Sequence, residues 1–314
     1  NVAIGFESLT TENAGGGNVA LGYRALKTVD NDDGHNIAIG YEAMVNSANA
    51  YYNIAIGRSA GAEMSSANVG SCVLIGYQSG DAINHADASG TVAIGKSALT
   101  ALTSGAGNVA VGYQASTAIT TGAYNTVLGY QALVTDDVGD TSTAIGYKSL
   151  GLQNTSSTAN SGNTAVGFET GYNNVTGTNN TYLGFMAGKG GSGSESNNVG
   201  VGKDALLSVT DGSDNVAIGN GALDAITSGG RNIGIGSTAG SAMTNNSYNT
   251  VIGYAAFATA NTGEESNTVI GYGAGADIDH ADSDGNVIIG QSAGSGGGAA
   301  MASCVVIGQY AMNS

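Results

Sequence analysis

Proline and tryptophan are absent from this chain, and cysteine and basic residues are scarce. Two cysteines in 314 residues exclude a disulfide-stapled scaffold. Eight basic residues against 24 acidic ones give a net charge of −16, which argues against nucleic acid or an anionic membrane surface as a partner. No apolar run approaches the roughly 18 residues that a membrane span requires. At 41%, the hydrophobic content is too high for a disordered chain.

One phrase runs through the whole sequence. It reads Asn-(Val/Thr/Ile)-Ala-Ile-Gly-Tyr-x-Ala-(Leu/Gly), and it occurs eighteen times with a modal spacing of 17 residues between its glycines. We call these glycines the repeat glycines and expect each to mark a bend or a close backbone approach. They are Gly5, Gly22, Gly40, Gly57, Gly76, Gly95, Gly112, Gly129, Gly146, Gly167, Gly184, Gly202, Gly219, Gly236, Gly253, Gly271, Gly290 and Gly308.

The phrase predicts an all-β parallel β-solenoid over residues 1–314, with eighteen short coils and no domain boundary. Branched residues on either side of a small one indicate a short strand before the repeat glycine, and we expect a second short extended segment after it. The polar remainder of each repeat, which carries the length variation, reads as turns. Stacked coils about 4.8 Å apart would form a rod of about 85 Å, and the lack of proline fits interior strands.

The strand segments are apolar on both faces, whereas a half-exposed strand alternates apolar with polar residues. We expect one face to fill the coil and the other, lined by small alanine and glycine, to lie against other copies of the chain. The sequence therefore predicts an obligate homo-oligomer, with a trimer favoured. The asparagine that opens most phrases is expected to stack into a ladder of side-chain amides.

These residues resemble a known family. The segment Asn125 to Leu133, Asn-Thr-Val-Leu-Gly-Tyr-Gln-Ala-Leu, is similar to the head repeats of YadA-type trimeric autotransporter adhesins and still more to the related repeats of phage tail fibres. The resemblance covers all 314 residues and implies a trimeric left-handed parallel β-roll. Because the chain starts and stops within the pattern, we expect it to be part of a longer fibre chain.

The resemblance implies a structural role on a virion or an extracellular cell surface. The favoured expectation is the shaft of a phage tail fibre that projects a receptor-binding tip for attachment to the host. The alternative is the head of a bacterial trimeric adhesin that binds host matrix or glycans. The expected partners are two further copies of the chain and a host receptor or glycan, bound through the tip or the flank.

Two matched loops contain candidate metal ligands. His85 and Asp87 lie in one loop and His280 and Asp282 in the other, each histidine nine residues after a repeat glycine. Three copies in a trimer could bring three such pairs to one ion, although a duplicated variant turn is the simpler interpretation. The acidic loops 30–33 and 279–284 lack the ligand spacing of known calcium loops, so solvated turns are the favoured interpretation.

Neither cysteine is expected to form a disulfide within one chain. Cys72 and Cys304 take the place of the opening asparagine and lie 13 coils apart, about 62 Å along the predicted rod. That separation far exceeds the span of a disulfide, so buried free thiols are expected, with contact among the three equivalent copies of a trimer as the alternative.

We expect no enzyme activity and no cofactor, because no nucleophile–base set, carboxylate pair or phosphate loop stands out. The regular aromatic residues after the repeat glycines are expected to pack or form a surface column rather than bind sugars. Ice binding needs an unbroken threonine array, but the aligned threonines Thr143, Thr164 and Thr181 give way to valine and isoleucine at 199, 216 and 233.

Overall fold

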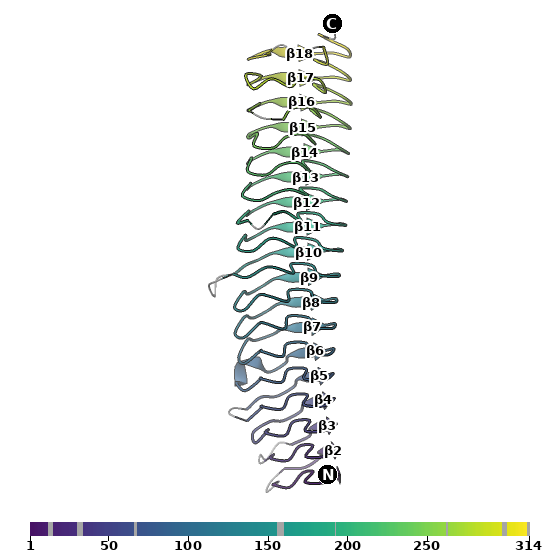
Figure 1. Cartoon of the computed structure of the whole chain (residues 1–314), viewed down its shortest axis with the longest axis vertical. Helices are drawn as coiled ribbons and strands as arrows, with labels where there is room; N and C mark the ends of the chain where they lie inside the picture. Colours follow the sequence, from purple (N-terminus) through teal and green to yellow (C-terminus); the bar gives the residue numbers. More distant parts are fainter. Residues whose placement is uncertain are drawn as a thin grey trace. The chain divides into compact units, whose positions relative to one another are not determined.

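The computed structural model describes residues 1–11, 15–29, 34–65, 68–155, 160–191, 193–261, 263–296 and 300–312. It divides into two compact units, Asn1–Gly162 and Asn163–Ser314. Within each unit, one three-residue strand per repeat stacks on the next (Figure 1). The first unit contains β1 (Val2–Ile4), β2 (Val19–Leu21), β3 (Ile37–Ile39), β4 (Ile54–Ile56), β5 (Val73–Ile75), β6 (Val92–Ile94), β7 (Val109–Val111), β8 (Thr126–Leu128) and β9 (Thr143–Ile145).

The second unit repeats the same arrangement. Its strands are β10 (Thr164–Val166), β11 (Thr181–Leu183), β12 (Val199–Val201), β13 (Val216–Ile218), β14 (Ile233–Ile235), β15 (Thr250–Ile252), β16 (Thr268–Ile270), β17 (Val287–Ile289) and β18 (Val305–Ile307). Sequential strands within a unit pair in parallel and in register, as Val199↔Val216 illustrates. The described residues contain no α-helix and one short 3-10 turn, η1 (Ala86–Ala88). The predicted all-β parallel β-solenoid is confirmed.

The segment after the repeat glycine is not the second strand that we expected. It is a series of turns in which the second and fourth residues after the glycine adopt left-handed backbone angles, as in Arg24 (φ 53°) and Leu26 (φ 51°). Their N–H groups still bond to neighbouring coils, since Arg24 N donates to Phe6 O at 2.9 Å and Leu26 N to Ala43 O at 2.9 Å. Hydrogen bonds between coils therefore hold this part of the chain in a curled rather than an extended conformation.

The repeat glycines occur where neighbouring coils come closest. Gly202 has a φ of +130°, and a Cβ added there would lie 2.6 Å from the carbonyl oxygen of Gly219 in the next coil. Only glycine combines this backbone angle with such a close approach of two main chains. The expectation of a bend with close backbone contact is confirmed.

The strand faces have the opposite orientation to the one expected from the sequence. The middle residue, usually alanine as in Ala20 and Ala38, is fully buried inside its coil, while the flanking branched residues point outward. Our assignment of the alanine face to the oligomer contact was therefore wrong. The interior is narrow, and where large residues from the turns such as Leu26 and Met44 fill it, there is room only for a small strand residue.

Large and small interior residues compensate one another. Where the strand carries Leu74 instead of alanine, the turns against it carry glycine, and a Cβ on Gly61 or Gly80 would lie 2.7 Å from a Leu74 methyl carbon. Tyr182 in β11 lies against Gly188 in the same way. The core is thus packed by volume across coils rather than within each repeat separately.

The opening asparagines form the predicted ladder. Asn36 donates its backbone N–H to Oδ1 of Asn18 at 2.8 Å, and its Nδ2 donates to Ala50 O at 2.8 Å and to Asn18 Oδ1 at 3.3 Å. The pattern recurs in the second unit from Asn215 to Asn232. Each buried amide therefore satisfies polar main-chain groups that would otherwise lack partners inside the coil.

Candidate functional site

The outward face of the strands carries the branched residues that the sequence analysis had placed inside the coil. The first and third residues of each strand point away from the coil, and many stay open to solvent, including Leu128 (48% exposed) and Leu183 (48% exposed). The exposed outward hydrophobic residues are Val2, Ile4, Leu21, Ile56, Val109, Leu128, Leu183, Ile218, Ile233, Val305 and Ile307, and Thr126 and Thr181 are exposed at the same positions. A regular set of exposed branched side chains on one sheet face is typical of an interaction surface. We call this set the outer strand face.

Aromatic side chains line up immediately after the repeat glycines. Tyr113, Tyr130 and Tyr147 stack with ring centroids 5.1 and 5.3 Å apart and nearly parallel planes. Phe168 and Phe185 stack in the same way in the second unit. We call this series the aromatic column. Its residues are Phe6, Tyr23, Tyr41, Arg58, Tyr77, Lys96, Tyr113, Tyr130 and Tyr147 in the first unit and Phe168, Phe185, Lys203, Asn220, Ser237, Tyr254, Tyr272, Gln291 and Gln309 in the second.

Cations replace rings in the aromatic column without interrupting it. The Arg58 guanidinium lies 5.3 Å from the Tyr41 ring centroid and 5.8 Å from that of Tyr77, and Lys96 Nζ lies 5.7 Å from Tyr77 and 5.6 Å from Tyr113. These are cation–π contacts, which are favourable because the ring face carries negative charge density. Rings with a neighbour on both sides, such as Tyr77 and Tyr130, have their flat faces covered, and mainly the ring edge meets solvent.

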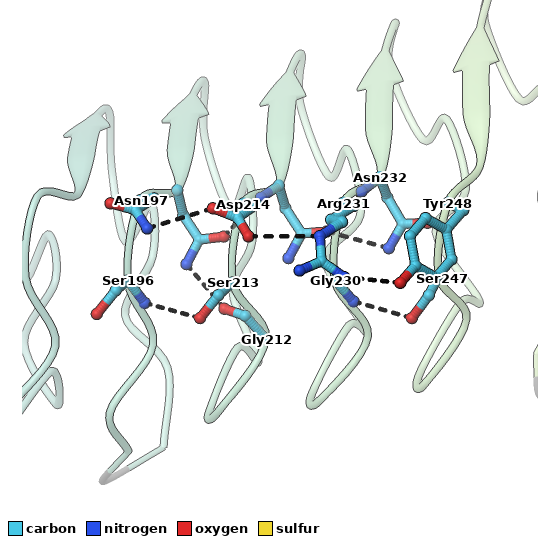
Figure 2. A network of polar contacts seen from close by, with 12 residues as sticks. Ser196, Asn197, Gly212, Ser213, Asp214, Gly230, Arg231, Asn232, Ser247 and Tyr248 are labelled. Carbon is cyan, nitrogen blue, oxygen red and sulfur yellow. Dashed lines mark hydrogen bonds and ion pairs between the residues drawn. The ribbon is translucent and has the colours of Figure 1, made fainter.

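A second column, made of polar side chains, lies five residues before the repeat glycines. Figure 2 shows Asn197 donating from Nδ2 to Asp214 Oδ1 at 3.2 Å, and Arg231 Nε 3.8 Å from Asp214 Oδ2. Arg231 Nη1 also donates to the Tyr248 hydroxyl at 2.7 Å. Exposed pairs of this kind add little to stability individually. Their side chains satisfy one another along the solenoid and leave no set of free groups converging on a ligand.

A buried carboxyl group in the second unit was missed by the sequence analysis. Glu195 is fully buried, neither carboxylate oxygen has a hydrogen-bond partner, and a Cβ on Gly190 would lie 3.4 Å from Glu195 Oε1. Burial raises the pKa of Glu195 to about 8, with a smaller contribution from the charge of Asp211. Burial also raises the pKa of Tyr182 well above its ordinary value, helped by the nearby Glu195. The signal in the sequence is an acidic residue at a position where the adjacent repeats carry glycine.

Glu264 occupies the equivalent position, seven residues before a repeat glycine. It is also buried, but its Oε2 accepts a hydrogen bond from Asn246 Nδ2 at 2.6 Å, while its Oε1 has no partner. Burial raises the pKa of Glu264, and the Asn246 bond opposes that rise. Glu264 is less strongly desolvated than Glu195 and also has an amide donor, and both differences favour its charged form relative to that of Glu195.

The structure places each predicted histidine next to the aspartate of its own loop. His85 Nδ1 accepts the backbone N–H of Asp87 at 3.3 Å and lies 3.3 Å from Asp87 Oδ2, and His280 and Asp282 repeat the arrangement at 3.2 and 3.8 Å. Among the described residues, no three histidine, cysteine or acidic side chains gather into a group that could hold a metal. The metal site shared between copies remains a prediction, which a His85→Ala variant with unchanged bound metal and unchanged melting would contradict.

The acidic loops and cysteines were also assigned from sequence. Residues 30–33 lie outside the described residues. In the loop 279–284, Asp284 Oδ1 accepts the backbone N–H of Glu265 at 2.7 Å, which is a turn-stabilising role. Both cysteines are free thiols as predicted, with Cys72 buried and Cys304 partly buried. Burial raises the pKa of Cys72 to about 11, so this thiol stays protonated and unreactive.

Comparison with known proteins does not assign the chain to a family. No protein-family model matches it, and no curated protein matches it. Within the described ranges there is no ligand-sized cavity. No helix in the described part of the chain is long and apolar enough to cross a bilayer. The outer strand face and the aromatic column are therefore the features from which a function must be inferred.

Proposed function

We propose that this chain is a shaft segment of a phage tail fibre, assembled as a homotrimer and without enzymatic activity, that holds a receptor-binding tip away from the virion. The observation that supports the proposal most is the outer strand face. Eighteen strands repeat the same outward positions, and Leu21 (43% exposed) and Leu128 remain open in the interior of the first unit. Such a face is costly in water but stabilising between chains.

The geometry of the strands favours association through the outer strand face. Parallel strands normally have both faces covered. In a single chain the inner face packs against the coil's own core and the outer face meets solvent. Side-by-side copies in register would repeat each contact at every coil, so the contact area grows with the number of coils. Closed symmetry then limits the assembly to a small number of chains, and the resemblance of the repeats supports three.

The aromatic column bears on the alternative adhesin function. A protein that binds glycans through aromatic residues presents a free ring face to the sugar. Here Tyr130 is covered on both faces, by Tyr113 and by Tyr147. Rings covered in this way support a packing role, and a shaft is favoured over a flank that binds glycans.

Sedimentation equilibrium of the whole chain at micromolar concentration tests the assembly. We expect a mass of three chains. A Leu128→Asp variant, which places a charge on the outer strand face, should dissociate it or weaken it strongly, whereas Thr121→Asp in an exposed turn should leave it intact. A monodisperse monomer for the unmodified chain would refute association through this face.

Antibody labelling of particles and cells from the source tests the location. Electron microscopy should show the label along thin fibres attached to virions, at a distance from the fibre tip. Label distributed over a bacterial surface, with none on virions, would instead support the adhesin head.

A further inference from the structure

Tyrosine pairs occur on consecutive coils of the aromatic column. In addition to the Tyr113, Tyr130 and Tyr147 series, Tyr23 and Tyr41 stack at 4.9 Å, and Tyr254 and Tyr272 stack at 5.2 Å, with the planes of each pair within 13° of parallel. Coils in register hold equivalent atoms of both rings side by side. The phenol groups of each pair are thus kept together by the backbone without any diffusion of side chains.

This arrangement suits one particular covalent reaction of tyrosine. A one-electron oxidant, such as a peroxidase supplied with hydrogen peroxide, removes one electron and one proton from each phenol. The two phenoxyl radicals then form a carbon–carbon bond between the ring positions next to the hydroxyls. The hydrogens on those two carbons move to the oxygens and restore both phenols. Two electrons and two protons leave in total and reduce one hydrogen peroxide molecule to two waters.

The rings are accessible to such an oxidant. Tyr113, Tyr130 and Tyr147 are 38%, 44% and 39% exposed, so their edges meet solvent although their faces are covered. Partial exposure also leaves each ring room to turn from the stacked orientation towards the coupled one. The limiting condition for coupling is the presence of a second tyrosine on an adjacent coil.

We propose that the stacked tyrosine pairs of the aromatic column are sites of oxidative cross-linking, at which dityrosine joins neighbouring coils of one chain. The product would fasten the coil stack covalently on its outside. This inference concerns a modification of the surface and does not depend on the proposed function.

The chain contains its own matched control. Tyr77 occupies the same column and is 38% exposed, as is Tyr113, but its neighbours on the adjacent coils are Arg58 and Lys96. The nearest tyrosines in the column are two coils away, about 10 Å, which is too far for ring carbons to bond. Tyr77 should therefore be oxidised without coupling within the chain.

The test uses the whole chain at low concentration with peroxidase and hydrogen peroxide. Dityrosine fluorescence reports coupling, denaturing gels separate links within a chain from links between chains, and mass spectrometry of a broad-specificity digest locates them. We expect links within the chain at 23–41, 113–130, 130–147 and 254–272, and none at Tyr77. Links that are mainly between chains, or as frequent at Tyr77 or at Tyr124 (65% exposed, outside the column) as at Tyr113, would refute the proposal.

Two substitutions sharpen the result. Tyr130→Phe keeps the stack but removes the shared partner, so both links in that series should vanish while the 254–272 link persists. Lys96→Tyr should create a new link to Tyr77 or to Tyr113. Retention of dityrosine at Tyr113 in Tyr130→Phe, or no new link in Lys96→Tyr despite an unchanged circular dichroism spectrum, would contradict adjacency as the cause.

Discussion

Replacing Glu195 with glutamine should remove a large pH dependence from the stability of the second unit. Glutamine keeps the size and shape of the side chain but cannot ionise. In the native protein, the carboxyl group is fully buried with two unpartnered oxygens, so the folded state favours its neutral form. The unfolded chain exposes the same group to water, where ionisation is free of that penalty.

The size of the effect follows from the two pKa values. The pKa of Glu195 is raised from an ordinary 4.5 to about 8 in the folded protein. Between these values the folded state holds a proton that the unfolded state has lost, so the free energy of unfolding falls as pH rises. The contribution of the protonated Glu195 to the free energy of unfolding is complete below pH ~4.5 and is lost by about pH 8. The loss is about 1.4 kcal/mol for each pH unit, or about 5 kcal/mol at most.

The assay compares the native chain with Glu195→Gln from pH 5 to pH 9. Thermal unfolding gives the global effect, and amide hydrogen exchange gives the local one, because stacked coils can open in parts. Gly190 and Gly191 are suitable reporters, since their N–H groups donate to Leu207 O and Val209 O at 2.9 and 3.0 Å beside the buried carboxyl. At each pH, exchange is compared between the two proteins, which cancels its intrinsic pH dependence.

We expect the stability of Glu195→Gln, relative to that of the native chain, to increase as the pH rises. Glu264→Gln is the matched control and should give a smaller change, because Asn246 already donates to that carboxyl. A difference between native and Glu195→Gln proteins that stays constant across the range would refute the reasoning.

Four further substitutions, one of them a control, test the packing of the coils by thermal unfolding. Asn232→Ala should cost about 2–6 kcal/mol, because it orphans Asn249 N–H and Asn246 C=O inside the coil, and exchange of the Asn249 amide should rise with it. Gly202→Ala should cost at least about 3 kcal/mol from its left-handed angle and the close Gly219 carbonyl. Gly16→Ala, with open space around it, should be neutral, and an equal loss in both glycine variants would contradict the steric argument. Leu74→Ala should cost about 2–5 kcal/mol by leaving a cavity, and a cost below about 1 kcal/mol would show that the site collapses around it.

The period and chemistry of the repeat were sufficient to predict a parallel β-solenoid. Branched residues on both sides of a small one, as in Val216 to Ile218, have few conformations other than a strand available to them. The asparagine ladder was predictable for a related reason, since a buried amide recurring once per coil must bond to its own kind or to the backbone.

The faces of the strands were not predictable in the same way. When both faces are apolar, alternation carries no information about which one is inside. Interior volume decides it, and that volume depends on residues such as Leu26 that reach inward from the turn. The left-handed angles of Arg24 and Leu26 also lack a local signal, because neither residue favours that conformation by itself.

The candidate sites also differ in whether the sequence could predict them. The aromatic column was predictable because it follows directly from the repeat, whereas the buried state of Glu195 was not. Its neighbours in sequence are polar, and only the folding of the coil brings Tyr182 and Gly190 against it. An acidic residue in a Gly- and Ser-rich segment otherwise reads as a solvated turn.

A large side chain in one repeat often packs against glycines in the next. This matching limits how such a chain can lengthen or shorten during evolution. Leu223 fits against Gly234 and Gly240 of the following repeat, where an added Cβ would lie 2.6 Å and 2.8 Å from its side chain. Deleting that following repeat alone would set Leu223 against Val251 and Phe257, which are already large. Insertions and losses that move several repeats together keep such partners matched, so the heritable module of this protein is longer than its 17-residue period.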